Sequence, residues 1–259
     1  DFEKGLNYKN QFNEPMQHCE YLQREQLEQV NPHISAQLQQ AIYFPQLANV
    51  RNPRLLKSLI TYLKQHPNIY VVENTWIEKF NIQNQNIQSI QTSNGQHFEA
   101  DEFVIATGAW SNTWSTQLQL SIPVEPVQGQ MMLFKTPENW LPTMCMNKVM
   151  YLIPRMDGHV VCGSSMDHLG FDKRPSVQTQ QNIYKACLEM VPELANFPIV
   201  KQWAGLRPSS PTGIPYIGKM PELNNLWANF GHYRNGLCMG PASARLLRQL
   251  MLNQETLVD

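Results

Sequence analysis

An arginine follows each of two apolar segments in the last quarter of the chain. Arg207 follows the run Trp203–Leu206, and Arg234 lies between two glycines in the stretch Gly231–Gly236, which reads GHYRNG. A guanidinium group can bind a carboxylate through two parallel hydrogen bonds, so each arginine is a candidate for holding an anionic substrate. Taken alone, each is equally compatible with an ordinary salt bridge or a solvated side chain.

Two turns that contain small residues are candidates for binding a ligand through their backbone. The continuously apolar run Phe103–Ala106 suits a buried parallel strand, and it leads directly into Thr107 and Gly108. GHYRNG similarly precedes a helix that we expect from about Pro241 to Leu252. In open α/β sheets, ligands bind beyond the carboxyl ends of strands, and helix N-termini favour negative charge. The alternatives are a tight structural turn and a surface loop.

The hydrophobic pattern predicts a mixed α/β (α+β) chain. Helical spacing predicts helices over 24–30 and 177–190, and a third after Asn52 whose apolar face ends before Pro67. Alternating segments with Asn-rich turns after Trp76 predict a β-meander. We also expect the following strands: Ile69–Val72, Val124–Phe134, Tyr151–Pro154, His159–Gly163, Ile199–Leu206 and Leu226–Phe230.

Composition limits the classes of function. Hydrophobic residues make up 42% of the 259 residues and charged residues 16%, so a sizeable core is expected. The net charge of −1 gives no reason to expect nucleic-acid binding, and no apolar run is long enough to span a membrane. The five cysteines form no CxxC pair and predict free thiols in the cytoplasm. The seven scattered histidines predict no metal site.

Several motifs occur in a defined order after residue 40: VIATGAWS, PVQGQM, YLIPR, WAGLRP, PYIGKMPE and GHYRNGLCMGPA. Together they resemble the D-amino acid oxidase family of FAD-dependent amine oxidases, and most of all the glycine oxidases of thiamine biosynthesis. The resemblance implies a Rossmann-like FAD-binding domain and a mostly antiparallel substrate domain. Single motifs are moderately specific, whereas the ordered set is highly specific.

The resemblance also implies roles for individual residues. Arg207 and Arg234 match arginines at the substrate, and Tyr151 matches a pocket tyrosine whose hydroxyl reaches the substrate carboxylate. Matches to the cofactor-binding positions are Ile77, Thr107, Gly108, Trp110, His232, Tyr233, Arg234, Asn235, Gly236, Leu237 and Cys238.

The implied reaction is oxidative deamination of glycine, sarcosine or a D-amino acid. A hydride passes to flavin N5, and oxygen reoxidises the flavin to give hydrogen peroxide. An amino-acid dehydrogenase, a tRNA-modifying flavin domain and an inactive flavin-free fragment remain alternatives. Assembly into a homo-oligomer is also left open.

The implied layout of the family differs from this chain at its start. Family members open with a strand and GxGxxG, but no GxG occurs among the 13 glycines here. We therefore expect that the N-terminal dinucleotide-binding part, roughly the first hundred residues of a family member, is absent. The implied division is 1–48 as a segment of the substrate domain, 49–121 as part of the FAD-binding domain, 122–204 as the substrate domain, and 205–259 as the C-terminal part of the FAD-binding domain.

Overall fold

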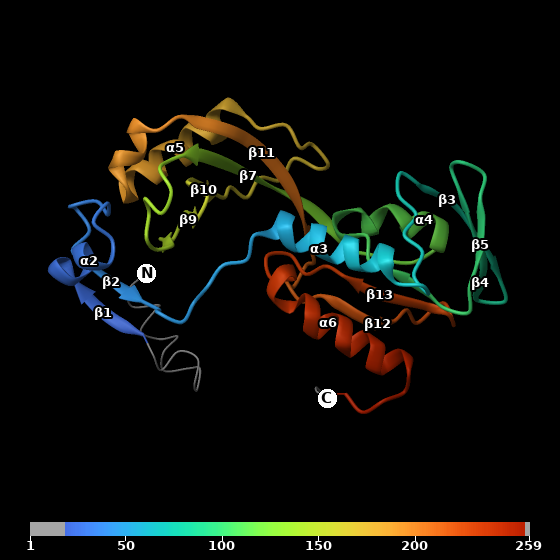
Figure 1. Cartoon of the computed structure of the whole chain (residues 1–259). Coiled ribbons are helices and arrows are strands. Elements are labelled where there is room, and N and C mark those ends of the chain that lie inside the picture. The colour runs from blue at the N-terminus through green and yellow to red at the C-terminus, as the bar shows by residue number, and fades with distance from the viewer. Residues whose placement is uncertain (1–18, 257–259) are drawn as a thin grey trace. The chain divides into compact units, whose positions relative to one another are not determined.

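A computed structural model of the chain describes residues 19–256 (Figure 1). The chain forms two compact units. The first contains the residues up to Leu59 with 129–166 and 173–205, and the second contains 60–128, 167–172 and the residues from Leu206 onward. Residues 1–18 and 257–259 of the predicted segments lie outside the described residues. The division of the chain into substrate-domain and FAD-binding segments stays a prediction.

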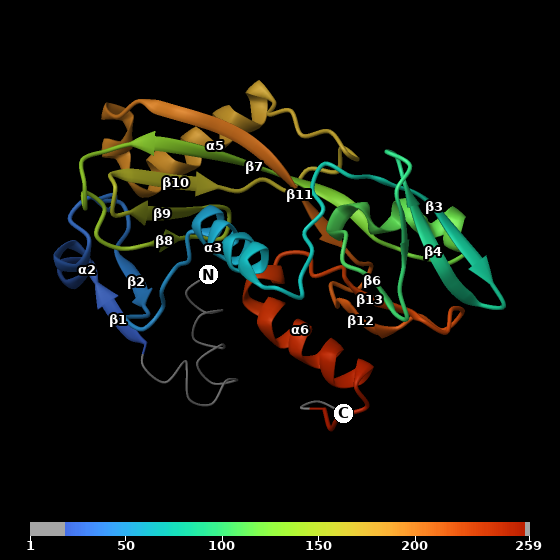
Figure 2. The same cartoon turned by 45° about the vertical axis from the view of Figure 1, so that its right-hand side comes forward.

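A five-stranded sheet is the main element of the first unit (Figure 2). Its strands, in spatial order, are β11 (Ile199–Ser209), β7 (Glu125–Lys135), β10 (His159–Gly163), β9 (Tyr151–Arg155) and β8 (Cys145–Met146). The strands β7, β10, β9 and β8 pair antiparallel. Side chains along a strand alternate between the two faces of the sheet. The prediction of β11, β7, β10 and β9 is confirmed, with ends that shift by up to three residues, whereas the short strand β8 was not predicted.

Helix α5 (Val177–Met190) covers one face of this sheet, and its bounds match the prediction. Its buried residues Gln180, Ile183, Cys187 and Met190 recur at helical spacing. Of these, Ile183, Cys187 and Met190 share a hydrophobic core with alternate strand residues such as Met132, Phe134, Leu152 and Cys162, all almost fully buried. Ser176 caps the helix because its side chain accepts a hydrogen bond from Thr179 N. The short helix η2 (Pro192–Asn196) follows.

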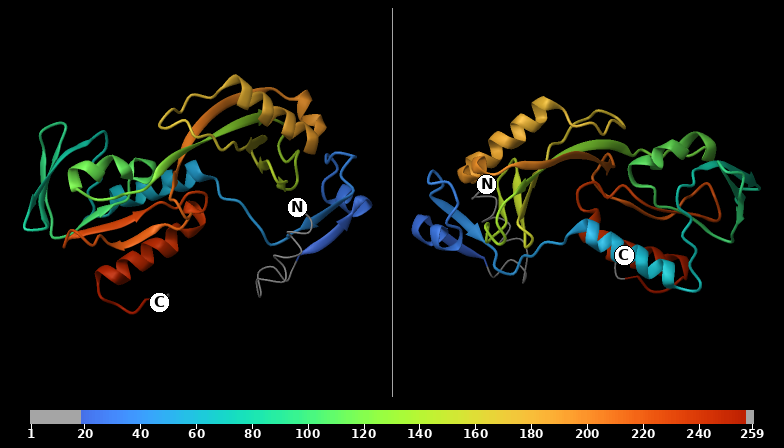
Figure 3. Two further views of the ribbon diagram at one scale, coloured as in Figure 1. Left: turned by 180° about the vertical axis from the view of Figure 1, so that it is seen from behind. Right: turned by 45° about the horizontal axis from the view of Figure 1, so that its top comes forward.

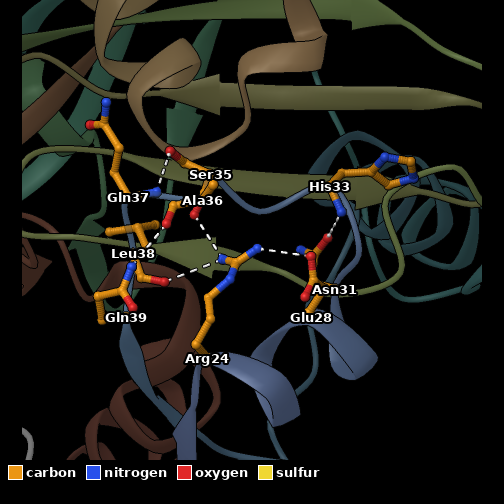
Figure 4. Close-up of polar contacts among 9 residues, drawn as sticks. All are labelled: Arg24, Glu28, Asn31, His33, Ser35, Ala36, Gln37, Leu38 and Gln39. Atoms are coloured by element: carbon orange, nitrogen blue, oxygen red, sulfur yellow. Dashed lines mark hydrogen bonds and ion pairs between the residues drawn. The ribbon is translucent and has the colours of Figure 1, made fainter.

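A hairpin of β1 (Glu20–Gln23) and β2 (Gln40–Tyr43) encloses helix α2 (Arg24–Val30) near the start of the described chain. Figure 4 shows how one side chain ties the connection together. The Arg24 guanidinium donates to the carbonyl oxygens of Ser35 and Leu38, at 2.9 and 3.2 Å, and to the Glu28 carboxylate at 3.1 Å. Arg24 therefore fixes the connection between α2 and β2.

The second unit contains a three-stranded sheet in the order β12 (Tyr216–Lys219), β13 (Leu226–Phe230) and β6 (Phe103–Ile105). β13 pairs antiparallel with β12 and parallel with β6, which confirms the expected parallel strand. Helix α6 (Gly236–Met251) lies along β12 and β13 (Figure 3). Helices η1 (Gly108–Trp114) and α4 (Ser115–Leu118) follow β6.

The predicted β-meander is confirmed as a second sheet in this unit. It contains β3 (Ile77–Gln83), β4 (Asn86–Thr92) and β5 (His97–Glu99), each antiparallel to the next. Gly95, with φ +81°, turns the chain between β4 and β5. Apolar residues of β3, β4, β6 and β13 share one core with Trp114 of η1.

Two predictions around helix α3 (Asn52–Gln65) are corrected. The helix includes Asn52 instead of being capped by it, and none of its side chains is buried; Leu56 and Leu59 are 58% and 48% exposed. The segment Ile69–Val72 is not a strand, and Tyr70 is 89% exposed. A strand is stable only when its backbone pairs with a neighbour, and the apolar sequence of this segment cannot supply one.

Candidate functional site

Two of the predicted turns lie next to each other in the second unit. The parallel register pairs Leu226 with Phe103 and Ala228 with Ile105, so β13 and β6 end at the same edge of their sheet. Beyond that edge the chain turns at Gly108, with φ +56°, and at Gly231, with φ +83°. This positive-φ backbone favours glycine. The carboxyl ends of parallel strands are where α/β folds bind ligands.

The GHYRNG loop is also joined to the end of β11. Ser209 and His232 form an isolated bridge, and Tyr233 N donates to Pro208 O at 2.8 Å. Gly231 is buried, and a Cβ there would lie 3.3 Å from the Tyr216 ring. The loop therefore has a fixed path, set by its neighbours in the second unit.

These contacts bring the backbones of the two predicted arginines together. Arg207 and Arg234 are each one residue from the hydrogen bond that joins Pro208 and Tyr233. Arg207 is half-buried, and its Nη1 donates to the carbonyl oxygen of Gln128 at 3.4 Å, whereas Arg234 is exposed. The backbones of two positively charged residues thus lie near one end of the loop, and a pair of arginines is well suited to binding an anion.

His232 is held by a residue that the sequence did not single out. Its ring Nε2 lies 2.9 Å from Ser243 Oγ on α6. Burial lowers the pKa of His232 below its usual value of 6.5. The imidazole is therefore neutral at pH 7, so it supplies a hydrogen-bonding group to the loop and no charge.

The half-buried His232 predicts a loss of stability in mild acid. As the pH falls below about 6.5, the unfolded chain binds a proton that the folded ring resists, so the free energy of unfolding decreases. Urea unfolding between pH 7 and pH 5 should show a smaller decrease for His232→Gln than for the wild type. His97→Gln, on the exposed strand β5, is the control and should keep the wild-type slope. A wild-type slope in His232→Gln would contradict this assignment.

The helix after the loop begins earlier than predicted. α6 starts at Gly236, and Pro241 lies inside it, so Gly236, Leu237 and Cys238 form its first turn and are not part of a loop. The side chain of Asn235 makes no capping hydrogen bond. Backbone N–H groups at a helix start have no partner within the helix, so this turn suits a negatively polarised ligand group. Leu237 and Cys238 are exposed.

The turn after β6 has a side-chain network of its own. Thr107 Oγ1 lies 3.1 Å from Ser111 Oγ and accepts a hydrogen bond from Trp114 Nε1 at 3.3 Å. Trp110 is 37% exposed and its ring stacks on Phe171, with 5.9 Å between ring centroids. Hydrogen bonds with Ser111 and Trp114 thus hold Thr107 in the turn, and the ring of Trp110 lies beside it.

Two predicted site residues lie elsewhere. Tyr151 belongs to β9 in the first unit, where its hydroxyl donates to the sulfur of Met131 at 3.4 Å. Ile77 begins β3, in a different sheet from β6 and β13. The turns that follow the parallel strands β6 and β13 therefore bring Thr107 and Gly108 close to the loop. The contacts described for these turns include neither Tyr151 nor Ile77.

Sequence reasoning overlooked three polar residues near the loop. Ser243 bonds His232, and the side-chain oxygens of Ser210 and Asn229 are buried without a hydrogen-bond partner. Asn229 left a signal, because it interrupts the apolar run of β13. Buried polar atoms usually have a partner, so each unpaired one calls for a specific explanation, and a bound ligand is one such explanation. Ser210 and Ser243 left no comparable signal.

Other types of site find little support in the described structure. All five cysteines are free thiols, and burial raises the pKa of Cys145 to about 11, which disfavours the nucleophilic thiolate. Across residues 19–256, no cluster of three or more His, Cys, Asp or Glu side chains could hold a metal ion. No helix in that range has the length and apolarity required to cross a bilayer.

Known proteins are similar to this chain in fold and in sequence. The chain is 44% identical over 228 residues to glycine oxidases from Pseudomonas aeruginosa and Pseudomonas putida, which covers 88% of the chain. It is 30% identical over 200 residues, or 76% of the chain, to a D-amino acid dehydrogenase from Vibrio vulnificus, and covers 48% of that protein. The crystal structure of glycine oxidase from Geobacillus kaustophilus superposes with a TM-score of 0.90 at 26% identity, over 100% of this chain and 68% of that one.

The chain spans only part of these relatives, at 62% of the length of the two Pseudomonas proteins. The model of the FAD dependent oxidoreductase family matches residues 2–250, which is nearly the whole chain. The fold, the joined turns and this match lead to one assignment: the chain belongs to the FAD dependent oxidoreductase family.

Proposed function

We propose that this protein is an FAD-dependent oxidase that oxidatively deaminates a small amino acid: glycine, sarcosine or a D-amino acid. The observation that carries the proposal is the hydrogen-bonded junction of β11 with the GHYRNG loop, which joins the backbones of two arginines beside two glycine turns. The identity of 44% to proteins named glycine oxidase supports the choice of substrate. The chain spans 62% of the length of those relatives, and the proposal extends their named activity to it.

The residues of the second unit fit a flavin. Left-handed glycine turns allow close approach of a planar ring, and the first turn of α6 offers unpaired N–H groups to a polar edge of that ring. We propose that residues 232–238, Thr107, Gly108 and Trp110 would hold the flavin ring, and that the backbone of Ile77 would hold the adenine end. When bound, the flavin accepts a hydride at N5 from the substrate and passes the electrons to oxygen, which forms hydrogen peroxide.

The substrate is held by charge and geometry. An amino acid carries its carboxylate at one end, and the planar fork of Arg207 can bind both carboxylate oxygens. Arg234 adds a second positive charge on the same loop junction. For Tyr151, in the first unit, we propose a hydroxyl that donates to the carboxylate. With the carboxylate fixed, the Cα–H bond is held in one orientation, and this positioning is the main contribution of the protein.

We propose different roles for the two units. We propose that the first unit carries the substrate domain, predicted as 1–48 and 122–204, and that the second carries the FAD-binding parts, predicted as 49–121 and 205–259. The proposed partners are the amino acid and oxygen, without nucleic acid; a homo-oligomer is left open. The free cysteines favour the cytoplasm as the proposed compartment.

Peroxide release tests the proposal. We expect flavin-loaded protein to release hydrogen peroxide with glycine, sarcosine or D-alanine in a peroxidase-coupled assay, in proportion to the oxygen consumed. The matching negative control is a carboxylate without an amine, such as acetate. Protein that binds FAD and shows no turnover with any of the three would contradict the proposal.

A dehydrogenase is the second candidate, because the chain is 30% identical over 200 residues to a D-amino acid dehydrogenase. The same preparation separates the two. A dehydrogenase would reduce an artificial dye at the expense of the amino acid while releasing little peroxide in air. An oxidase would consume oxygen at a rate that the dye hardly changes.

A further inference from the structure

Three residues form a row across the sheet of the first unit. In the antiparallel register, Gly163 of β10 is paired with Met131 of β7 on one side and with Tyr151 of β9 on the other. Residues paired in this way point to the same face of a sheet. The adjacent row, which contains Cys162, faces the buried core under α5. Met131, Gly163 and Tyr151 therefore share the face opposite to α5.

The missing side chain of Gly163 allows its two neighbours to meet. A Cβ at this position would lie 2.3 Å from the sulfur and 2.9 Å from the terminal methyl carbon of Met131, so the thioether lies directly over the glycine. From there the sulfur accepts the hydrogen bond of the Tyr151 hydroxyl, at 3.4 Å. A larger residue in the central strand would separate the methionine from the tyrosine.

We propose that Met131 is a positioning residue for Tyr151, and that Gly163 provides the space in which it acts. This inference rests on the proposed function, in which the Tyr151 hydroxyl donates to the substrate carboxylate. A thioether is a weak acceptor, and a carboxylate is a much stronger one. Met131 therefore keeps the phenol oriented before substrate arrives, and the hydroxyl then exchanges this weak hydrogen bond for one to the carboxylate at little cost.

The contact itself can be tested without flavin. In protein labelled with [methyl-¹³C]methionine, the Met131 resonance is assigned by its loss in Met131→Leu. We expect that resonance to shift in Tyr151→Phe and in Gly163→Ala, because each variant removes the hydroxyl or displaces the sulfur. The resonance of Met156, which is 84% exposed, should stay in place and serves as the internal control. An unchanged Met131 resonance in both variants would overturn the proposed contact.

A double-mutant cycle tests the role in catalysis. In flavin-loaded enzyme, Met131→Leu should raise KM for the amino acid about 3- to 10-fold, the range expected for ordering one side chain on binding, with little change in kcat. In a Tyr151→Phe background the same substitution should have no further effect, since the group that it positions is gone. Gly163→Ala should reproduce the KM increase, whereas Met156→Leu should leave both constants unchanged. Equal effects of Met131→Leu in both backgrounds would overturn the positioning role.

The two readouts separate failure of this inference from failure of the proposed function. If the enzyme turns over no amino acid, the proposed function fails, and the methyl resonances still decide whether Met131 holds Tyr151. If turnover is normal and Met131→Leu leaves KM unchanged, the positioning role fails while the proposed function stands.

Discussion

Replacing Arg207 by alanine should lower kcat/KM for glycine by about 100-fold or more. Truncating one partner of a desolvated, hydrogen-bonded charge pair costs about 2–5 kcal/mol. Arg207 is half-buried at the end of β11 and linked to Gln128 O, so its position is set before substrate binds. Arg207→Lys should retain part of the activity, because the charge remains while the planar fork is lost. Steady-state peroxide release gives both constants.

The choice of substrate shows whether Arg207 acts on the carboxylate. A small amine without a carboxylate should be oxidised at similar, low rates by the wild type and by Arg207→Ala. Arg245→Ala is the matched control, since Arg245 is an exposed arginine of the same unit on α6. It should leave both reactions unchanged. An Arg207→Ala enzyme with wild-type KM for glycine would exclude the carboxylate role.

Elements whose signals are local could be predicted from the sequence. The bounds of α2, α5, β10 and β13 agree with the prediction, because helical spacing, turn residues and short apolar runs all act within a few residues. The parallel strand β6 could also be predicted, since a continuously apolar run before a small-residue turn is typical of buried strands. The GHYRNG loop could be predicted for the same reason, because it follows the apolar run Leu226–Phe230 and begins with a glycine.

What depends on partners distant in sequence could not be predicted. The run Ile69–Val72 has the composition of a strand, but no neighbour pairs with it, so its backbone stays irregular. The apolar residues of α3 follow the predicted helical spacing, but the spacing alone does not determine their burial, and none of them is buried. The Met131–Gly163–Tyr151 row depends on the register of three strands, which no pattern within one strand encodes. Likewise, α6 begins at Gly236 and contains Pro241, although a proline is typical of the first position of a helix.

Replacing Gly158 by alanine should destabilise the first unit by about 3 kcal/mol, or roughly 10 °C in the unfolding midpoint. Gly158 ends the turn between β9 and β10 with φ +72°, and its carbonyl accepts a hydrogen bond from Thr136 N at 2.9 Å. A Cβ would lie 2.5 Å from Thr136 O and 3.0 Å from the carbonyl carbon of Pro137. Both are backbone atoms, which cannot swing aside as a side chain can, so the turn must move and the hydrogen bond must lengthen.

Gly95→Ala separates the steric part of this loss from the backbone part. Gly95 lies in the β4–β5 turn with a similar φ of +81°, but a Cβ there would meet no atom within 4 Å. Its alanine variant should therefore lose only the left-handed backbone term, about 1 kcal/mol. Calorimetry or urea unfolding of both variants measures the difference, which we attribute to the close approach of the Thr136–Pro137 backbone. Equal losses in the two variants would show that φ alone requires glycine at position 158, and that the packing of the β9–β10 turn against Thr136 contributes little to the stability of the first unit.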